Sequence, residues 1–158
     1  MKRMPAKPRQ GSSPLAFVDT NILLYAHDRG AGEKQKQAAA LLTRLWETRS
    51  GVLSSQVLQE FFVNVVRKLQ PPMAIPQARE VVRMYSVWVQ HETGPNEILR
   101  ASELMELTGF SFWDSLVIAA AEKSGASLLY SEDLQHGQRL AGLLIQNPFA
   151  LPLEHSAT

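Results

Sequence analysis

The chain has 158 residues, a formal net charge of +1, 45% hydrophobic residues and 20% charged residues. This length and composition fit one ordinary folded domain with a single core, and they exclude a disordered chain. The near-neutral charge excludes a general affinity for polyanions, so any contact with nucleic acid requires a local basic patch. The chain has no cysteine, which excludes disulfides and thiolate metal sites. No apolar run reaches the roughly 18–20 residues of a membrane helix. We therefore expect a cytoplasmic protein without a membrane segment.

Residues 1–13 form a basic stretch that contains Pro5, Pro8 and Gly11. The stretch lacks the hydrophobic centre of a secretory signal, so we expect a flexible basic arm. Residues 14–150 are expected to form the single domain, and residues 151–158 a C-terminal tail.

Short apolar runs and helix-like apolar stripes alternate along the domain. In chain order, the expected strands are 15–18, 52–53, 127–130 and 143–145, with a further short strand within 87–93, and the expected helices are 21–27, 33–49, 55–69, 76–88, 96–108 and 110–123. We expect Ser54 or Ser55 to cap the third helix. The strands show no signal for a two-residue hairpin turn, which favours a parallel sheet of about four or five strands with helices on both faces.

Four acidic residues occupy corresponding places in this pattern. Asp19 and Asp133 directly follow predicted strands, Asp114 opens a helix, and Glu60 lies in the first turns of a helix that follows a strand. In a parallel sheet these places share one edge, where ligands bind. Carboxylates packed together must take up protons or bind cations. Because no cysteine or histidine pattern accompanies them, the oxygen ligands favour Mg²⁺ or Mn²⁺ over Zn²⁺.

Each acid also has a purely structural explanation. Asp19 can cap the following helix, and Asp114 can form a capping box with Ser111. Glu60 alone can be a half-exposed helix residue. Asp133 alone can be a turn residue, and its neighbour Glu132 is a competing candidate for the fourth acid. A site is therefore indicated only by the four acids together.

Several stretches resemble the motifs of PIN-domain nucleases. The stretch Phe-Val-Asp-Thr-Asn-Ile-Leu at 17–23 resembles their opening motif, Phe-Trp-Asp-Ser-Leu at 112–116 the third acidic motif, and residues 127–137 the fourth. Glu60 stands where the family has its helical glutamate. The similarity spans residues 15–149, and a chain of this size looks most like a VapC-type toxin of a toxin–antitoxin pair. Ser115 replaces a frequent alanine and Ser131 a frequent threonine, and the hydroxyl at 131 is kept.

The resemblance implies a Rossmann-like PIN fold and a metal-dependent endoribonuclease that hydrolyses RNA phosphodiester bonds with Mg²⁺ or Mn²⁺. Carried over by position, the catalytic and metal-site residues are Asp19, Glu60, Asp114 and Asp133, and the orienting residues are Asn21 and Ser131. The implied partners are the RNA substrate, a cognate antitoxin and a second copy in a homodimer. Candidates for steering the substrate are Arg29, Lys34 and Arg139.

Two other classes remain open at this point. A magnesium phosphatase of the haloacid-dehalogenase kind places a second acid two residues after its nucleophile, where this chain has Asn21. A non-catalytic receiver or interaction module is the other alternative. A receiver shows a pair of acids after the first strand and a lysine after the last, and residues 18–19 and 145–147 show neither.

Overall fold

A computed structural model describes residues 13–150, so the expected tail and all of the expected arm except Ser13 lie outside the described residues. The described chain contains a five-stranded sheet in the order β2-β1-β3-β5-β4. The strands are β1 (Ala16–Val18), β2 (Gly51–Val52), β3 (Leu128–Tyr130), β4 (Arg139–Leu140) and β5 (Leu143–Gln146). β1, β2, β3 and β5 are parallel, and β4 runs antiparallel to β5.

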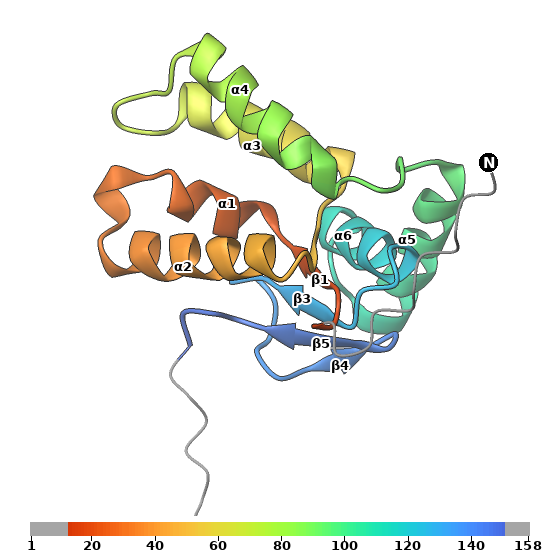
Figure 1. The fold of residues 1–158 in the computed structure, drawn as a ribbon. Coiled ribbons are helices and arrows are strands. Elements are labelled where there is room, and N and C mark those ends of the chain that lie inside the picture. The colour runs from red at the N-terminus through yellow and green to blue at the C-terminus, as the bar shows by residue number, and fades with distance from the viewer. Residues whose placement is uncertain (1–12, 151–158) are drawn as a thin grey trace, which may run out of the picture.

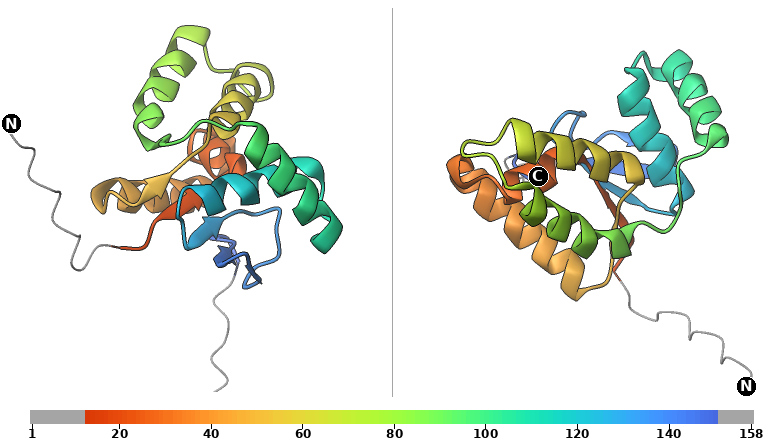
Figure 2. Two further views of the ribbon diagram at one scale, coloured as in Figure 1. Left: turned by 90° about the vertical axis from the view of Figure 1, so that its right-hand side faces the viewer. Right: turned by 90° about the horizontal axis from the view of Figure 1, so that it is seen from above.

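Helices cover both sides of the sheet, with α2 and the α5–α6 pair on opposite sides of the strands (Figure 2, left). The α-helices are α1 (Thr20–Ala26), α2 (Glu33–Glu47), α3 (Ser55–Arg67), α4 (Ile75–Tyr85), α5 (Pro95–Thr108) and α6 (Phe112–Lys123), and the 3-10 helices are η1 (Arg29–Ala31) and η2 (Ser86–Trp88). Figure 1 shows α3 and α4 lying over α1 and α2. This arrangement confirms the predicted α/β fold with a mostly parallel sheet.

Strand β1, which lies between β2 and β3, organises the core because its three residues are completely buried. Phe17 pairs with Val52 on one side and Leu129 on the other. A strand buried on both faces has to be apolar throughout rather than alternating. This explains why a run as short as three residues was recognisable in the sequence.

The expectation that the sheet lacks a tight hairpin was wrong. β4 and β5 are joined by Ala141 and Gly142, whose φ angles are 52° and 77°. Two successive positive φ angles are the geometry of a tight hairpin turn, which normally selects Asn-Gly or Gly-Gly. Alanine at the first position hid this turn from the sequence pattern.

The expected short strand within residues 87–93 is also reduced. Residues 86–88 form η2, and Val89 makes one isolated parallel bridge to Leu53. The N-cap of α3 is Ser54, whose hydroxyl accepts a hydrogen bond from the backbone N–H of Val57 at 3.3 Å. In residues 13–150 no single helix is long and apolar enough to cross a membrane. The helices α5 and α6 meet those criteria only as a pair bent by 117°.

Candidate functional site

The site is built around Asp19, the residue that follows β1 and caps α1. Its carboxylate oxygen Oδ1 accepts a hydrogen bond from the Thr20 backbone N–H at 2.7 Å. Val18 pairs with Tyr130 in β3, so the residues that follow these two, Asp19 and Ser131, lie side by side. The Ser131 hydroxyl donates to the other Asp19 oxygen at 2.8 Å. Asp19 is therefore both a helix cap and a member of the site.

Asp19 is only 6% exposed, and burial raises its pKa from 3.8 to about 6. The hydrogen bonds from Ser131 and Thr20 lower the pKa, and the nearby carboxylates of Asp133 and Glu60 raise it further. Removing a carboxylate from water disfavours its charged form unless positive charge compensates. The ion pairs among residues 13–150 use other acids, namely Glu33, Glu80, Glu97, Glu103, Glu122 and Glu132.

Glu60 is held from two sides. The Thr20 hydroxyl donates to its Oε2 at 2.6 Å, and the Gln56 side-chain amide donates to its Oε1 at 2.9 Å. Gln56 is itself buried at 6% exposure. Sequence reasoning missed both partners. Gln56 precedes Glu60 by four residues, a spacing that places two side chains on one helix face and could have indicated the pair.

Asp133 lies beside Asn21, whose side-chain amide donates to Oδ2 of Asp133 at 3.0 Å. The Asn21 carbonyl oxygen accepts from the backbone N–H of Glu132 at 3.4 Å. The backbone N–H of Asp133 donates to the Ser131 hydroxyl at 3.2 Å. Asn21 and Ser131 thus connect the end of β1 with the end of β3, as orienting residues would.

The competing acid, Glu132, is paired with a cation. Lys34 approaches Glu132 at 2.7 Å, and its ammonium lies 4.9 Å from the ring centroid of Tyr25. One of the three steering candidates is therefore already engaged with a carboxylate. Arg29 and Arg139 are exposed. The pairing of Glu132 favours Asp133 as the fourth acid.

Asp114 lies in the first turn of α6, where its backbone N–H donates to the Ser111 hydroxyl at 3.1 Å. Burial raises the pKa of Asp114, and the charges of Asp133 and Glu60 add to the effect. Ser115, the next residue, is fully buried, and its hydroxyl has no hydrogen-bond partner among the described residues. Asp114 thus lies close enough to Asp133 and Glu60 for their charges to raise its pKa.

The donor set fits a hard divalent cation in its chemistry, since it consists of carboxylates with neighbouring amide and hydroxyl groups. Burial raises the pKa values of Asp19 and Asp114, neighbouring carboxylates raise them further, and no cation is among the causes of either shift. Within residues 13–150, however, no three acidic or histidine side chains already form a metal-binding group. Glu60 and Asp133 are instead turned toward Thr20 and Asn21. The residues therefore fit a cation by type and charge, and each of these two carboxylates is held by a side-chain hydrogen bond.

Comparison with known proteins gives one family and one fold. The family model described as PIN domain matches residues 16–140. No curated protein sequence matches the chain. Among solved structures, the chain is similar to the Mycobacterium tuberculosis VapC20, described as a sarcin-ricin loop cleaving toxin, with 19% identity and a TM-score of 0.54 over 72% of this chain and 86% of that one.

Two further structures are similar over a larger share of the chain. A toxin–antitoxin complex from Klebsiella pneumoniae has 17% identity and a TM-score of 0.59, covering 86% of this chain and 99% of that one. VapBC2 from Rickettsia felis, solved with a DNA fragment from its promoter, has 19% identity and a TM-score of 0.58, covering 84% and 98%. At these identities the likeness is one of fold.

Proposed function

The chain belongs to the PIN-domain family, and from this premise we propose that it is a metal-dependent endoribonuclease, the toxin of a toxin–antitoxin pair. The observation that carries the proposal is the meeting of Asp19 and Asp133 after neighbouring parallel strands, linked through Ser131 and Asn21, with the charges of Glu60 and Asp114 close by. The similarity in fold to VapC20, described as a sarcin-ricin loop cleaving toxin, supports the proposed activity. Family membership also favours this function over the phosphatase and receiver alternatives.

In the proposed mechanism Asp19, Glu60, Asp114 and Asp133 would hold Mg²⁺ or Mn²⁺. A bound divalent ion supplies a Lewis acid that lowers the pKa of water and neutralises phosphate charge. The remaining chemistry belongs to the chain itself. Ser131 and the Thr20 backbone keep Asp19 oriented and favour its charged form. Thr20 and Gln56 fix the carboxylate of Glu60, and Asn21 fixes that of Asp133.

The test is cleavage of a panel of tRNA, rRNA and mRNA fragments by the full chain with Mg²⁺ or Mn²⁺, with EDTA, and after Asp19→Asn. We expect EDTA to stop cleavage. We expect Asp19→Asn to lower the rate at least about a hundredfold, since loss of groups that only orient metal ligands already costs about 10–100-fold. Glu106→Gln, at an exposed acid on α5 outside the site, is the matched control. Cleavage that survives both EDTA and Asp19→Asn contradicts the mechanism.

The proposal includes an antitoxin partner, because two of the similar structures are toxin–antitoxin assemblies. A small reading frame beside the gene is the candidate source of that partner. Co-expression of its product should suppress RNA cleavage and yield a complex that purifies as one species.

The proposal also includes a homodimer, which light scattering of the isolated chain tests directly. A monomeric mass across the concentration range contradicts that part.

A further inference from the structure

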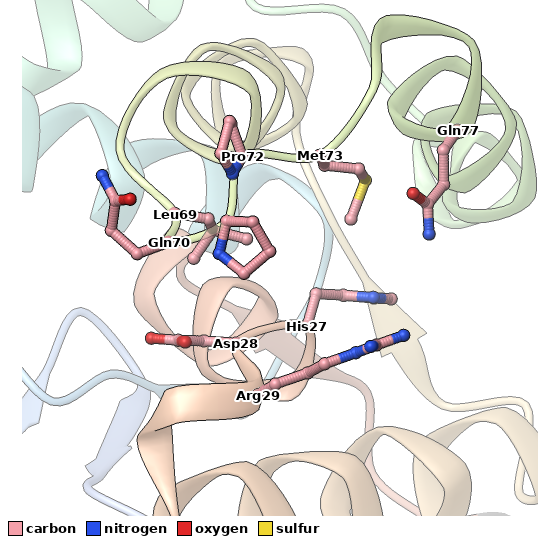
Figure 3. A pocket seen from close by; sticks show the side chains of 9 residues that line it. His27, Asp28, Arg29, Leu69, Gln70, Pro72, Met73 and Gln77 are labelled. Atoms are coloured by element: carbon pink, nitrogen blue, oxygen red, sulfur yellow. The ribbon is translucent and has the colours of Figure 1, made fainter.

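A polar cavity lies away from the four acids, between the C-terminal end of α1 and the loop that joins α3 to α4. Its volume is about 170 Å³, and its walls include Arg29, Met73 and Gln77. Figure 3 shows Arg29 and His27 extending from one wall, while Met73 and Gln77 reach toward them from the other. The cavity is thus bordered by a guanidinium, an imidazole, an amide and a thioether. Nothing in the acidic site uses these groups.

The cavity lies at the far end of the same two helices that carry the site. Asp19 caps the start of α1 and His27 its end, while Glu60 lies within α3 and Leu69 follows that helix. The two helices contact one another and run in the same direction (Figure 1). At a rise of 1.5 Å per residue, the cavity lies roughly 12–14 Å from the acids along the helices. A single-stranded nucleic acid crosses that distance within a few nucleotides.

The chemistry of the walls matches a nucleotide. The exposed Arg29 guanidinium offers several N–H donors in the plane that recognises phosphate. The Gln77 amide has both donors and an acceptor, which hydrogen-bond the edges of unpaired bases. Pro72 and Met73 provide apolar surface for the face of a base.

His27 and Asp28 determine where the phosphate of a bound nucleotide would lie in the cavity. The His27 ring is held edge-on against Phe61, with ring centroids 5.5 Å apart, and its Nε2 has no hydrogen-bond partner among the described residues. Burial lowers the pKa of His27, so the ring is neutral near pH 7. The Asp28 carboxylate accepts from the Gly30 backbone N–H at 2.9 Å. Because Asp28 repels phosphate, the phosphate is expected beside Arg29.

We propose that this cavity is a substrate subsite that takes up one base of a single-stranded RNA segment flanking the cleaved bond, with Arg29 on the adjoining phosphate. This inference rests on the proposed nuclease function and specifies which part of the RNA the cavity binds. A protein partner is the other class of macromolecule that could cover this surface. The cavity places an exposed arginine near the amide of Gln77, and it lies within a few nucleotides' length of the acids. Both features favour RNA.

The test compares two substrates with the full chain and Mg²⁺ or Mn²⁺. One is a longer single-stranded RNA, and the other is an oligonucleotide that spans only the cleaved bond and its adjoining nucleotides. Arg29→Ala should lower kcat/KM on the longer RNA about tenfold, mainly through KM, because one charge-assisted hydrogen bond is lost. It should leave the short substrate unchanged. Gln77→Trp, which fills the cavity, should have the same effect and remove any preference for the base at that position.

Arg83→Ala is the matched control, because Arg83 is a surface arginine on α4 that pairs with Glu80 and does not line the cavity. Thermal melting establishes that every variant is folded. If the wild type cleaves neither RNA, the nuclease function fails, and the subsite fails with it. If the wild type cleaves both and the two cavity variants match it on the longer RNA, the subsite alone is wrong. Variants that keep RNA kinetics but lose antitoxin binding also overturn it, since the cavity then serves a protein.

Discussion

At the scale of single residues, Gln56 offers the sharpest test of how the site is held. Its amide fixes Oε1 of Glu60 without belonging to the acidic set, so Gln56→Met keeps the volume and removes the hydrogen bond. Outer-shell partners of this kind are worth about 10–100-fold in activity or metal affinity. We expect a loss of this size in kcat/KM and a higher Mg²⁺ concentration for half-maximal cleavage.

Asn64→Ala is the control for Gln56. Asn64 donates to the backbone carbonyl of Glu60 at 2.7 Å and lies on the same helix, but its hydrogen bond leaves the carboxylate untouched. Steady-state kinetics as a function of Mg²⁺ should therefore separate the two variants. Equal effects of Gln56→Met and Asn64→Ala would show that helix integrity, rather than orientation of Glu60, is being measured.

The raised pKa of Asp19 predicts a pH dependence of stability in the metal-free protein. Between about pH 4 and pH 6 the folded state keeps a proton that the unfolded state has lost. The free energy of unfolding must therefore fall as pH rises through this window, and the penalty is complete above it. A shift of about two pKa units corresponds to about 3 kcal/mol.

Asp19→Asn removes this titration while retaining an oxygen that can accept from Ser131 or Thr20. In EDTA, the variant should be more stable than the wild type at pH 7.5 by up to about 3 kcal/mol, and the difference should vanish near pH 4. Urea unfolding at several pH values measures both curves. Curves that stay parallel from pH 4 to pH 7.5 would rule out Asp19 as the titrating group.

Some residues of the candidate site can be predicted from sequence motifs, whereas others are identified only by their contacts in the folded chain. Asp19, Asp133 and the two orienting residues lie at or near strand ends, and Glu60 and Asp114 lie near the starts of helices, so local sequence was sufficient to select them as candidates. The Thr20 hydroxyl reaches Glu60 across 40 positions of sequence, and no periodicity encodes that contact. The sequence motif already favoured Asp133 over Glu132, and the ion pair of Glu132 with Lys34 is a tertiary observation that supports the same choice.

At the scale of elements, position 51 in β2 requires glycine because Trp88 of η2 packs directly against it. A Cβ atom at this position would lie 2.7 Å from ring carbons of the buried Trp88, closer than real Cβ contacts. Gly51→Ala should lower the free energy of unfolding by about 1–3 kcal/mol through overpacking. For a chain of this size, this corresponds to a thermal midpoint lower by roughly 2–4 °C per kcal/mol.

Gly30→Ala is the matched control for Gly51, because its Cβ would meet the Asp28 carboxylate at an ordinary 3.4 Å. We expect that variant to melt within about 0.5 kcal/mol of the wild type, as surface substitutions do. A Gly51→Ala protein that melts with the Gly30→Ala protein would mean that Trp88 moves aside without cost.

The elements also show where the sequence pattern stops being informative. The expected α-helices all form, because each presents an apolar stripe, a capping residue or a glycine stop within its own sequence. β4 has two residues, and its pairing depends on a turn with Ala141 in a left-handed conformation. The register of β1, β2 and β3 is likewise a tertiary property: apolar runs of two or three residues identify buried strands but do not determine which strands pair with them.

At the scale of the whole molecule, the charge balance predicts a weak salt dependence of RNA binding. The chain has 16 lysines and arginines against 15 acids. Several of its cations, including Lys34, Lys123 and Arg100, are already paired with carboxylates in the described part of the chain. The acidic site itself repels phosphate in the absence of metal. We therefore expect side chains to neutralise few phosphates, and binding to come mainly from the metal site and local contacts such as Arg29.

For single strands, log K changes with log salt by about −0.7 per neutralised phosphate. We expect a slope of about −1 to −3, measured by fluorescence anisotropy of a labelled single-stranded RNA on the Asp19→Asn protein in increasing KCl. Introducing Arg29→Ala into that protein should reduce the magnitude of the slope by about 0.7, whereas Arg83→Ala should leave it unchanged. A slope near −10, as basic DNA-binding proteins give, would show that a much larger cationic surface engages the RNA. The acidic edge of the sheet would then be a minor part of the substrate interface.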